Sequence, residues 1–581
     1  MKIIYLSLVI FFCLSTIAKS QANFSFSNPN FEDLLKGNYK IEDFEKRLIH
    51  SDATLPGWIQ KQISPDSLSI FLSKIVSYRN RNTIADTVSE PDKGIRGARR
   101  MISEYLQFWN ERIFSVIEQS EFSFDYEMCG RLRHTELMSF VPGVGPQKNE
   151  LVIIEAHLDS RCEDRCDKAC VAEGAEDNGS GSAMMMELAR LLSQVELSRS
   201  IVIIWITGEE QGLGGSRSFA VYCKNNGIKI KAVFNNDIVG GIECGITSSP
   251  PSCPGPFHYD STHLRIFSSG TVNSMHKNLA RLSKVLFENS PNINSPIQLD
   301  VMINEDRTGR GSDHIPFREN GFTALRYTSS YEHGDGNPDQ PNYQDRQHSV
   351  RDVLGRDINN DGVLDSLFVN FAYLANNTFV NAVTACNAAT NFNAIPQIKA
   401  SVNGTQLTID ITNPDTTARE YLYLIRRITS VYYDTIIRTS STHLELGGLS
   451  GFQYYVSALA VGDHQWMNMI GNEVLVRIVN AVKDLNSPDR AVELIQNKPN
   501  PFDEYTIIPI VVNDRSKIRS AALIITDARG TQIQHMDLNL IEGVNEIFFE
   551  LPYGALSETY YYSLVVNGDI LQTLKMQVLN W

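Results

Sequence analysis

The sequence predicts an α/β catalytic domain, a three-layer sandwich with a mostly parallel central sheet, followed by two small all-β sandwich domains. Two observations carry this prediction. Unbroken apolar runs alternate with helical segments up to about residue 390, as in parallel sheets whose strands are buried on both faces. Beyond residue 393 short alternating strands separated by turn residues take over, which is typical of β-sandwiches. The apolar runs lie in residues 151–159, 201–210 and 231–237.

Hydrophobic periodicity gives the expected elements of the catalytic domain, which we place at residues 95–390. Apolar residues recur every three to four positions in several segments, and one or two edge strands are expected within residues 121–141. The predicted helices span residues 99–109, 182–194, 212–225, 276–288 and 366–384, and helical periodicity also occurs upstream at 31–49 and 67–78.

Composition limits the classes of function. The chain has 581 residues, enough for two to four domains, and 42% of them are hydrophobic. The formal net charge of −15 argues against nucleic acid as a partner, because phosphate binding needs a basic face. We interpret the acidity as a determinant of solubility.

Residues 1–20 are predicted to be a signal peptide. Lys2 precedes an almost wholly apolar run, and small residues at positions 18 and 20 place cleavage before Gln21. No later stretch reaches transmembrane length, so the mature chain is expected to be exported without a membrane span. Residues 21–94 contain no site-like cluster. They form an N-terminal region that is either a propeptide or an extension of the catalytic domain.

Acidic residues and a histidine follow the predicted strands. His157, Asp177, Glu210 and Asp237 come from four separate segments, and each is expected at the carboxyl edge of the sheet, where ligands gather in such folds. Imidazole and carboxylate groups are the ligands of catalytic zinc, and one carboxylate can bridge two ions. Five protein ligands and a bridging water would serve two zinc ions, so one more histidine is needed. The candidates are His314, His333 and His348.

Residues 95 to about 385 resemble the di-zinc exopeptidases typified by bacterial secreted leucyl aminopeptidases and glutamate carboxypeptidase. The resemblance implies the zinc exopeptidase fold and two Zn²⁺ per catalytic domain. In that family the histidine of the Ser-Asp-His segment is not a ligand, and the last ligand follows in an Arg-Gln-His segment, which favours His348 over His314 and His333. The matching segments are 156–160 (Ala-His-Leu-Asp-Ser), 176–181 (Glu-Asp-Asn-Gly-Ser-Gly), 208–212 (Gly-Glu-Glu-Gln-Gly), 236–237 (Asn-Asp) and 312–317 (Ser-Asp-His-Ile-Pro-Phe).

The resemblance also implies a role for each residue. Asp177 would bridge both zinc ions, with His157 and Asp237 on one ion and Glu210 and His348 on the other. Two further residues would serve catalysis. Glu209 would be the general base that takes a proton from the bridging water and passes it to the leaving amine, and Asp159 would orient the imidazole of His157.

The expected function is therefore a secreted zinc-dependent exopeptidase acting on peptides or proteins, and an aminopeptidase is favoured. A carboxypeptidase with the same two-zinc site stays open, because no residue in the sequence decides between a free amine and a terminal carboxylate. Glutaminyl cyclases share the fold but bind one catalytic zinc, so the full set of five ligands argues against them. A non-catalytic surface binding protein on the same fold is the remaining alternative.

Three cysteines lie in the segment between the first two expected ligands. Cys162, Cys166 and Cys170 have a spacing that matches no common zinc pattern, so disulfides are expected. Three cysteines of one loop cannot all pair within it, and at least one must reach elsewhere or stay free. Cys244 and Cys253 form a plausible local pair.

Residues 357–365 have the spacing of the first half of a calcium loop. Position twelve of such a loop would be Phe368, so the bidentate acid is missing. We therefore favour a polar turn over a calcium site.

The two C-terminal domains are predicted at residues 395–482 and 492–581. The first resembles a fibronectin type III module and is expected to act as a spacer. The second opens with Gln-Asn-Lys-Pro-Asn-Pro-Phe and is similar to the C-terminal sorting domains of the bacterial type IX secretion system. This resemblance implies the type IX machinery as a partner, and a protein that is secreted or attached to the outer-membrane surface after passing through the periplasm. A plain immunoglobulin-like adhesion domain is the alternative.

Overall fold

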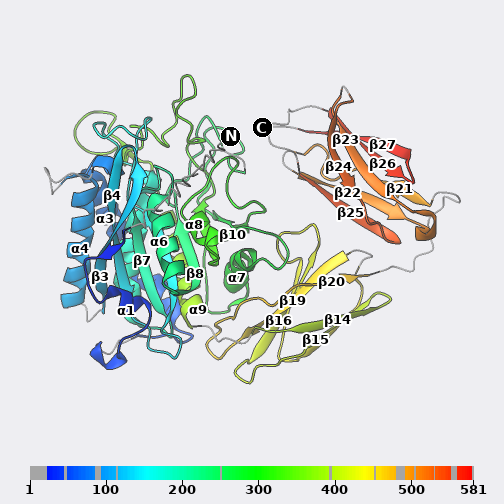
Figure 1. Cartoon of the computed structure of the whole chain (residues 1–581), viewed down its shortest axis with the longest axis horizontal. Helices are drawn as coiled ribbons and strands as arrows, with labels where there is room; N and C mark the ends of the chain where they lie inside the picture. Colours follow the sequence, from blue (N-terminus) through cyan, green and yellow to red (C-terminus); the bar gives the residue numbers. More distant parts are fainter. Residues whose placement is uncertain are drawn as a thin grey trace, which may run out of the picture.

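A computed structural model shows three bodies along the chain, a large α/β domain and two β-sandwiches (Figure 1). Within the described residues, no helix combines the length and the apolar character needed to cross a bilayer. The predicted signal peptide lies outside these residues. The structure describes residues 23–44, 49–85, 93–112, 116–248, 251–390, 395–449, 453–478, 491–502, 505–528, 530–550 and 559–578.

The α/β domain is organised around a sheet that has nine strands in the described chain, in the order β1-β3-β4-β7-β5-β8-β11-β9-β10. Its centre, β7-β5-β8-β11, is parallel, and so is the pair β9–β10 at one edge. The other pairs are antiparallel, so the sheet is mixed. The prediction of a mostly parallel sheet is therefore correct for the centre and for this edge pair, and wrong for the remaining strands. The strands are β1 (Ser25–Phe26), β3 (Glu118–Met128), β4 (Arg131–Val141), β5 (Glu150–His157), β7 (Ser200–Ile206), β8 (Lys229–Asn236), β9 (His263–Phe267), β10 (Gln298–Val301) and β11 (Ala324–Ser329).

Helices cover both faces of this sheet and give three layers. Side chains alternate along β5, so that Val152 and Ile154 face one hydrophobic core while Leu151 and Ile153 face the other. The first core is covered by α2 (Leu55–Gln62), α3 (Pro65–Ser77), α4 (Gly94–Arg112), α5 (Gly181–Leu192), α7 (Met275–Asn289) and α9 (Phe371–Thr390), and the second by α1 (Phe31–Leu35), α6 (Gly214–Asn225) and α8 (His314–Glu319).

The N-terminal region is built into this domain. Strand β1 extends the large sheet beside β3, and Phe31 of α1 is fully buried in the second core. Helix α3 begins after Ser64, whose hydroxyl caps the N–H of Ser67, and it buries Leu72 in the first core. The helix expected over residues 31–49 is much shorter, because Gly37 takes a left-handed φ of +73° at the end of α1.

The first β-sandwich packs directly on the α/β domain. It has a three-stranded sheet, β14-β15-β18, and a four-stranded sheet, β17-β16-β19-β20. Leu422 and Leu459 of the four-stranded sheet join the core that contains α7 and α9. The strands are β14 (Ile398–Asn403), β15 (Gln406–Ile411), β16 (Glu420–Arg427), β17 (Thr435–Thr439), β18 (His443–Leu446), β19 (Gln453–Val461) and β20 (Val474–Arg477).

Polar contacts lock the same interface. Glu473 accepts from two arginines of different domains, Arg281 of α7 at 3.2 Å and Arg426 of β16 at 2.6 Å, and all three are buried. The indole N–H of Trp466 donates to the carbonyl of Ser51 in the N-terminal region at 2.8 Å. The predicted spacer therefore makes buried contacts with the α/β domain.

The second β-sandwich has a core of its own. Its sheets are β21-β22-β25 and β24-β23-β26-β27, and its buried apolar residues form one separate cluster. The hydroxyl of Thr429 in the first sandwich donates to Oε2 of Glu546 in the second at 3.5 Å. The strands are β21 (Val492–Leu494), β22 (Tyr505–Val512), β23 (Ala521–Thr526), β24 (Gln532–Asp537), β25 (Gly543–Glu550), β26 (Thr559–Val566) and β27 (Asp569–Gln577).

Residues 357–365 form an exposed polar turn between the short strands β12 (Gly355–Arg356) and β13 (Ser366–Leu367). Asp357 accepts the backbone N–H groups of Asp361 and Gly362, at 3.2 and 2.8 Å, and Asn359 accepts that of Asp361 at 3.0 Å. These side chains therefore serve the turn itself.

Candidate metal site

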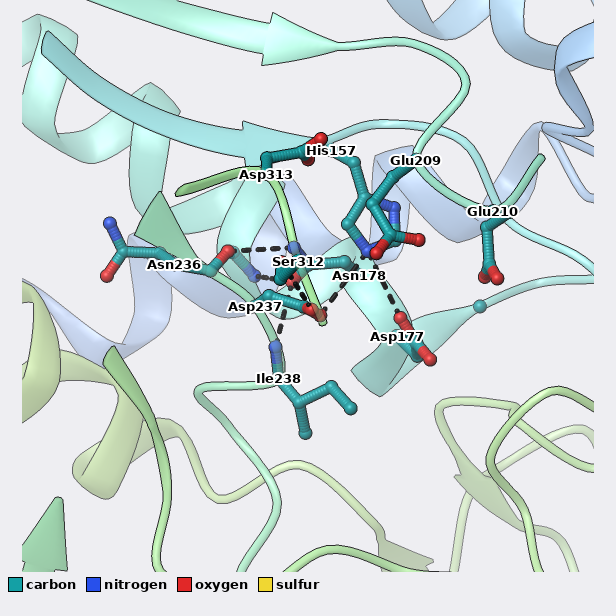
Figure 2. Close-up of polar contacts among 12 residues, drawn as sticks. His157, Asp177, Asn178, Glu209, Glu210, Asn236, Asp237, Ile238, Ser312 and Asp313 are labelled. Carbon is teal, nitrogen blue, oxygen red and sulfur yellow. Dashed lines mark hydrogen bonds and ion pairs between the residues drawn. The ribbon is translucent and has the colours of Figure 1, made fainter. Parts of the chain in front are cut away.

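Parallel strands bring the predicted ligands to one edge of the sheet. His157 ends β5, Glu209 and Glu210 follow β7, and Asp237 follows β8, so all four lie beyond the carboxyl ends of neighbouring strands (Figure 2). Asp177 reaches the same place from the turn Ala175–Ser180 that precedes α5.

The two carboxylate oxygens of Asp177 face different groups of side chains. Oδ1 lies 3.2 Å from Nε2 of His157, which is itself 3.3 Å from Oδ1 of Asp237. Oδ2 lies 3.3 Å from Nε2 of His348, which is 3.5 Å from Oε2 of Glu210. The structure thus brings the five predicted ligands together as two groups that share one carboxylate.

These separations fit metal binding. Ligand atoms placed 2.0–2.1 Å from a tetrahedral zinc ion lie about 3.3 Å from one another. Asp177, Glu210 and Asp237 are all more than nine-tenths buried, and Oε1 of Glu210 has no hydrogen-bond partner in the described residues. Burial, and next the nearby charge of Asp177, raises the pKa of Glu210 well above its usual range. Buried carboxylates this close together need cations, which the donor set of histidine and carboxylate suits.

The contacts of Asp237 leave one of its carboxylate oxygens available for a metal ion. Its Oδ2 accepts from Ser312 Oγ at 2.8 Å and lies 3.0 Å from Arg326 Nη2, while Oδ1 faces His157. Burial alone would raise the pKa of Asp237, but Arg326 and His157 hold it well below its usual range. The carboxylate is therefore ionised and oriented.

A cavity of ≈ 1320 Å³ opens over the two groups of ligands. Its lining includes Asp177, Glu209, Glu210, Asp237 and His348. Glu209 is half-buried, and one of its oxygens lies within 4.8 Å of ligand atoms of both His157 and Asp237. Burial raises the pKa of Glu209 well above the usual range of a glutamate.

The candidate site lies in a segment that is similar to a known family. Residues 140–370 match the model of peptidase family M28. The predicted hydrolase is therefore confirmed as a metallopeptidase, and zinc is the metal that the relatives' names support.

Similar proteins occur in fungi and bacteria. A probable zinc metalloprotease of Leptosphaeria maculans is 29% identical over 56% of this chain and 74% of its own length, and one of Pyricularia oryzae is 27% identical over 58% and 66%. Among solved structures, the LapA aminopeptidase of Legionella pneumophila is 20% identical over 60% of this chain and 78% of its own, with a TM-score of 0.41. The glutaminyl cyclase of Porphyromonas gingivalis is 17% identical over 56% and 98%, with a TM-score of 0.36.

Of the three candidate histidines in the α/β domain, His348 lies at the candidate metal site. Its Nδ1 donates to the carbonyl of Gly336 at 2.7 Å, which leaves Nε2 for a ligand role. Nε2 of His314 lies 3.2 Å from the carbonyl of Glu305, and His333 accepts the backbone N–H of Arg346 at 3.1 Å.

Asp159 takes a different place from the one expected. Its backbone carbonyl, not its carboxylate, contacts Nδ1 of His157 at 3.0 Å, while the nearer carboxylate oxygen is 3.7 Å from that nitrogen. The carboxylate instead accepts the backbone N–H groups of Gly208 at 3.0 Å, Glu209 at 3.4 Å and Glu210 at 3.1 Å. The backbone carbonyl of Asp159 therefore orients the imidazole of His157. Its carboxylate holds the turn that carries Glu209 and Glu210.

Two supporting residues escaped the sequence analysis. Asp352 accepts the backbone N–H groups of Glu176 at 3.0 Å and Asp177 at 2.9 Å. Arg81, fully buried, donates to the carbonyls of Leu158 at 2.8 Å and Gly174 at 2.9 Å. The loop that carries Asp177 is thus held by residues far away in the sequence on both sides, and no local pattern marks either of them.

Disulfides fasten the loop that borders the cavity. Cys162 pairs with Cys170, and Cys166 reaches Cys129 at the turn between β3 and β4. One cysteine of the loop therefore does reach elsewhere, as expected, and the predicted Cys244–Cys253 pair is present. The remaining thiols of the described chain, Cys223 and Cys386, are buried and free.

Proposed function

We propose that this protein is a zinc-dependent exopeptidase with two Zn²⁺ per catalytic domain, most simply an aminopeptidase that releases N-terminal residues from peptides. One observation carries the metal count: the two oxygens of Asp177 face two separate groups of ligand atoms at 3.2 and 3.3 Å. His157 and Asp237 complete one group, and Glu210 and His348 complete the other.

The residues of the site have different roles in the proposed reaction. Bound zinc would polarise the scissile carbonyl and lower the pKa of an attacking water. Glu209, which lines the cavity beside the ligands, accepts a proton from that water and delivers it to the leaving amine. The carboxylate of Asp159 accepts the backbone N–H groups of Glu209 and Glu210. These two hydrogen bonds hold Glu209 in this position and keep Glu210 directed to its ligand group.

The direct test uses the zinc-loaded full chain and one peptide with a free or an acetylated amino terminus, followed by mass spectrometry. Stepwise loss from the amino end of the free peptide alone is the expected result. Loss from the carboxyl end of both peptides would assign a carboxypeptidase, and no cleavage of either would favour a non-catalytic binding protein.

Variants test the residue roles. Glu209→Gln should retain both metals and lose nearly all turnover, because the ligands remain and the base does not. His348→Ala should lower the zinc content measured by atomic emission, whereas His314→Ala, which lies outside the ligand groups, should preserve it. Equal zinc loss in both histidine variants would contradict the assignment of His348.

We further propose that the chain is exported and sorted by a type IX secretion system, with residues 492–581 as the sorting domain and residues 395–482 as a fibronectin type III module. The motif that opens the last domain supports this proposal, together with its self-contained core. Fusing residues 491–581 to a reporter with a signal peptide in a type IX host should deliver the reporter to the surface or the medium. Retention in the periplasm would exclude the sorting role.

A further inference from the structure

Arg310 places a guanidinium in the wall of the cavity, one side chain away from the metal ligands. It belongs to the loop between β10 and α8 and lines the cavity with Glu209 and His348. Nη1 of Arg310 donates to Oε1 of Gln347 at 3.0 Å, and Nε2 of Gln347 donates to Oδ2 of Asp177 at 3.3 Å. A single amide group thus separates this cation from the carboxylate shared by the two ligand groups.

The guanidinium is fixed by Gly336. A Cβ built on this glycine would lie 2.7 Å from Cζ of Arg310, so the planar group packs directly against the backbone. The carbonyl of the same glycine accepts from Nδ1 of His348 at 2.7 Å. Arg310 and a predicted metal ligand are therefore positioned by one residue, and a group bound by Arg310 has a defined place relative to the metals.

In the described chain, Arg310 forms no ion pair. Within the described chain no carboxylate oxygen lies within 4.0 Å of its guanidinium, and its hydrogen-bond acceptor is the neutral amide of Gln347. Arg307 in the same loop is different, because it pairs with Asp306 at 3.0 Å and with Glu332. A guanidinium carries five N–H donors and stays charged in proteins, so Arg310 keeps most of its donors for a ligand.

We propose that Arg310 binds a carboxylate of the substrate beside the scissile bond, so that the preferred substrates of this site are acidic peptides. A planar guanidinium matches a carboxylate with two parallel hydrogen bonds, and such charge-assisted bonds are the strong ones. The carboxylate belongs either to the side chain of a terminal Asp or Glu or to the free carboxyl terminus of a dipeptide. This inference rests on the proposed peptidase function and adds its substrate class.

The test compares the full-length zinc-loaded protein with its Arg310→Gln variant on paired substrates. One set is X-Ala-Ala-Ala-amide with Glu, Gln or Leu as X, and the other is Leu-Ala with a free or an amidated carboxyl terminus. We expect kcat/KM to favour the acid over its neutral partner by about ten- to a hundredfold in one of the two sets, and Arg310→Gln to remove that preference. The set that responds identifies the source of the carboxylate.

Arg165→Gln is the matched comparison, because Arg165 lines the same cavity from an exposed position. Loss of the acid preference in Arg310→Gln alone supports the proposal. Equal loss in both variants would assign the preference to the general positive charge of the cavity and overturn it. A uniform fall of kcat for acidic and neutral peptides in Arg310→Gln would overturn it too, since Arg310 would then serve the reaction step.

Calorimetry makes the proposal independent of turnover. In the Glu209→Gln background the same peptides are titrated into protein with and without Arg310→Gln. Tighter binding of the acid member of a pair, lost with Arg310, supports carboxylate binding even if the wild type cleaves nothing, in which case only the proposed peptidase function fails. Equal dissociation constants for acid and neutral members would overturn the inference while leaving measured peptide cleavage intact.

Discussion

The two β-sandwiches share an architecture, one three-stranded and one four-stranded sheet, yet they meet the rest of the protein differently. In the first, Leu422 and Leu424 point outward from β16 into the core of the α/β domain, while Tyr421 and Tyr423 fill the sandwich itself. In the second, Tyr560 and Tyr562 of β26 fill the sandwich itself, and Tyr561 between them is exposed. The two sandwiches therefore differ in whether the outer face of the four-stranded sheet packs against the α/β domain.

Deletions should produce the largest contrast between the two sandwiches. Removing residues 491–581 should leave peptide cleavage and the melting temperature of the remaining chain unchanged, because the last domain has its own core. Removing 395–581 should lower the stability of the α/β domain by several kcal/mol, since each uncovered large apolar side chain costs about 1.5–3 kcal/mol. Calorimetry of the two truncated chains checks this. Equal stability of both would show that the first sandwich is a spacer after all.

Glu473→Gln probes the interface of the first sandwich with one atom changed. It leaves Arg281 and Arg426 buried without a counter-charge, and breaking a buried ion pair in this way costs about 3–5 kcal/mol. Denaturant unfolding measures the change. Arg419→Gln is the control, because its partner Asp463 is exposed and solvent screens such surface pairs so that they contribute little to stability. A loss no larger than that of the control would refute the buried role of Glu473.

Trp466→Phe should have a smaller effect at the same interface. It removes the hydrogen bond to Ser51 and leaves a partly buried carbonyl without that partner, at a cost of about 1 kcal/mol. Chemical denaturation of the full chain reports this value. An unchanged midpoint would mean that the N-terminal region does not depend on the first sandwich.

The weakest expected effect is the pH dependence of the contact between the two sandwiches. Burial raises the pKa of Glu546 at this contact, and Arg427 opposes the rise only in part. The folded form therefore binds the proton more tightly, so the contribution of this group is complete below its unfolded pKa and is lost as pH rises through the raised value. Melting curves from pH 4 to pH 7 should show this trend in the wild type and not in Glu546→Gln. The same slope in both would assign it to other groups.

The sequence predicted those parts of the site that follow from strand periodicity. His157, Glu210 and Asp237 stand at the ends of buried apolar strands, and parallel pairing then brings them together regardless of the loops. His348 follows no such rule, because it lies in an irregular loop with φ +55°, and only the resemblance to exopeptidases selected it over His314. No local pattern in the sequence indicates that Cys166 pairs with Cys129.

The parts that escaped prediction depend on contacts between distant segments. The antiparallel flank beside β7 arises from the long hairpin of β3 and β4, whose pairing with β7 no periodicity specifies. Arg81 and Asp352 act on backbone groups of the Asp177 loop, and a donor or acceptor of that kind has no sequence signature. Asp159 has two roles that the sequence did not predict, because its carbonyl contacts His157 while its carboxylate accepts the backbone N–H of Gly208.

The support of the Asp177 loop has a consequence for the order of assembly. Arg81 comes from the N-terminal region and Asp352 from near the end of the α/β domain, so the carboxylate of Asp177 acquires its final surroundings only after almost all of that domain has been made. During synthesis, the emerging chain holds an incomplete set of ligands for most of the time. Metal binding is then a late event that coincides with completion of the α/β domain, and hydrolytic activity arises only in chains in which this domain has folded.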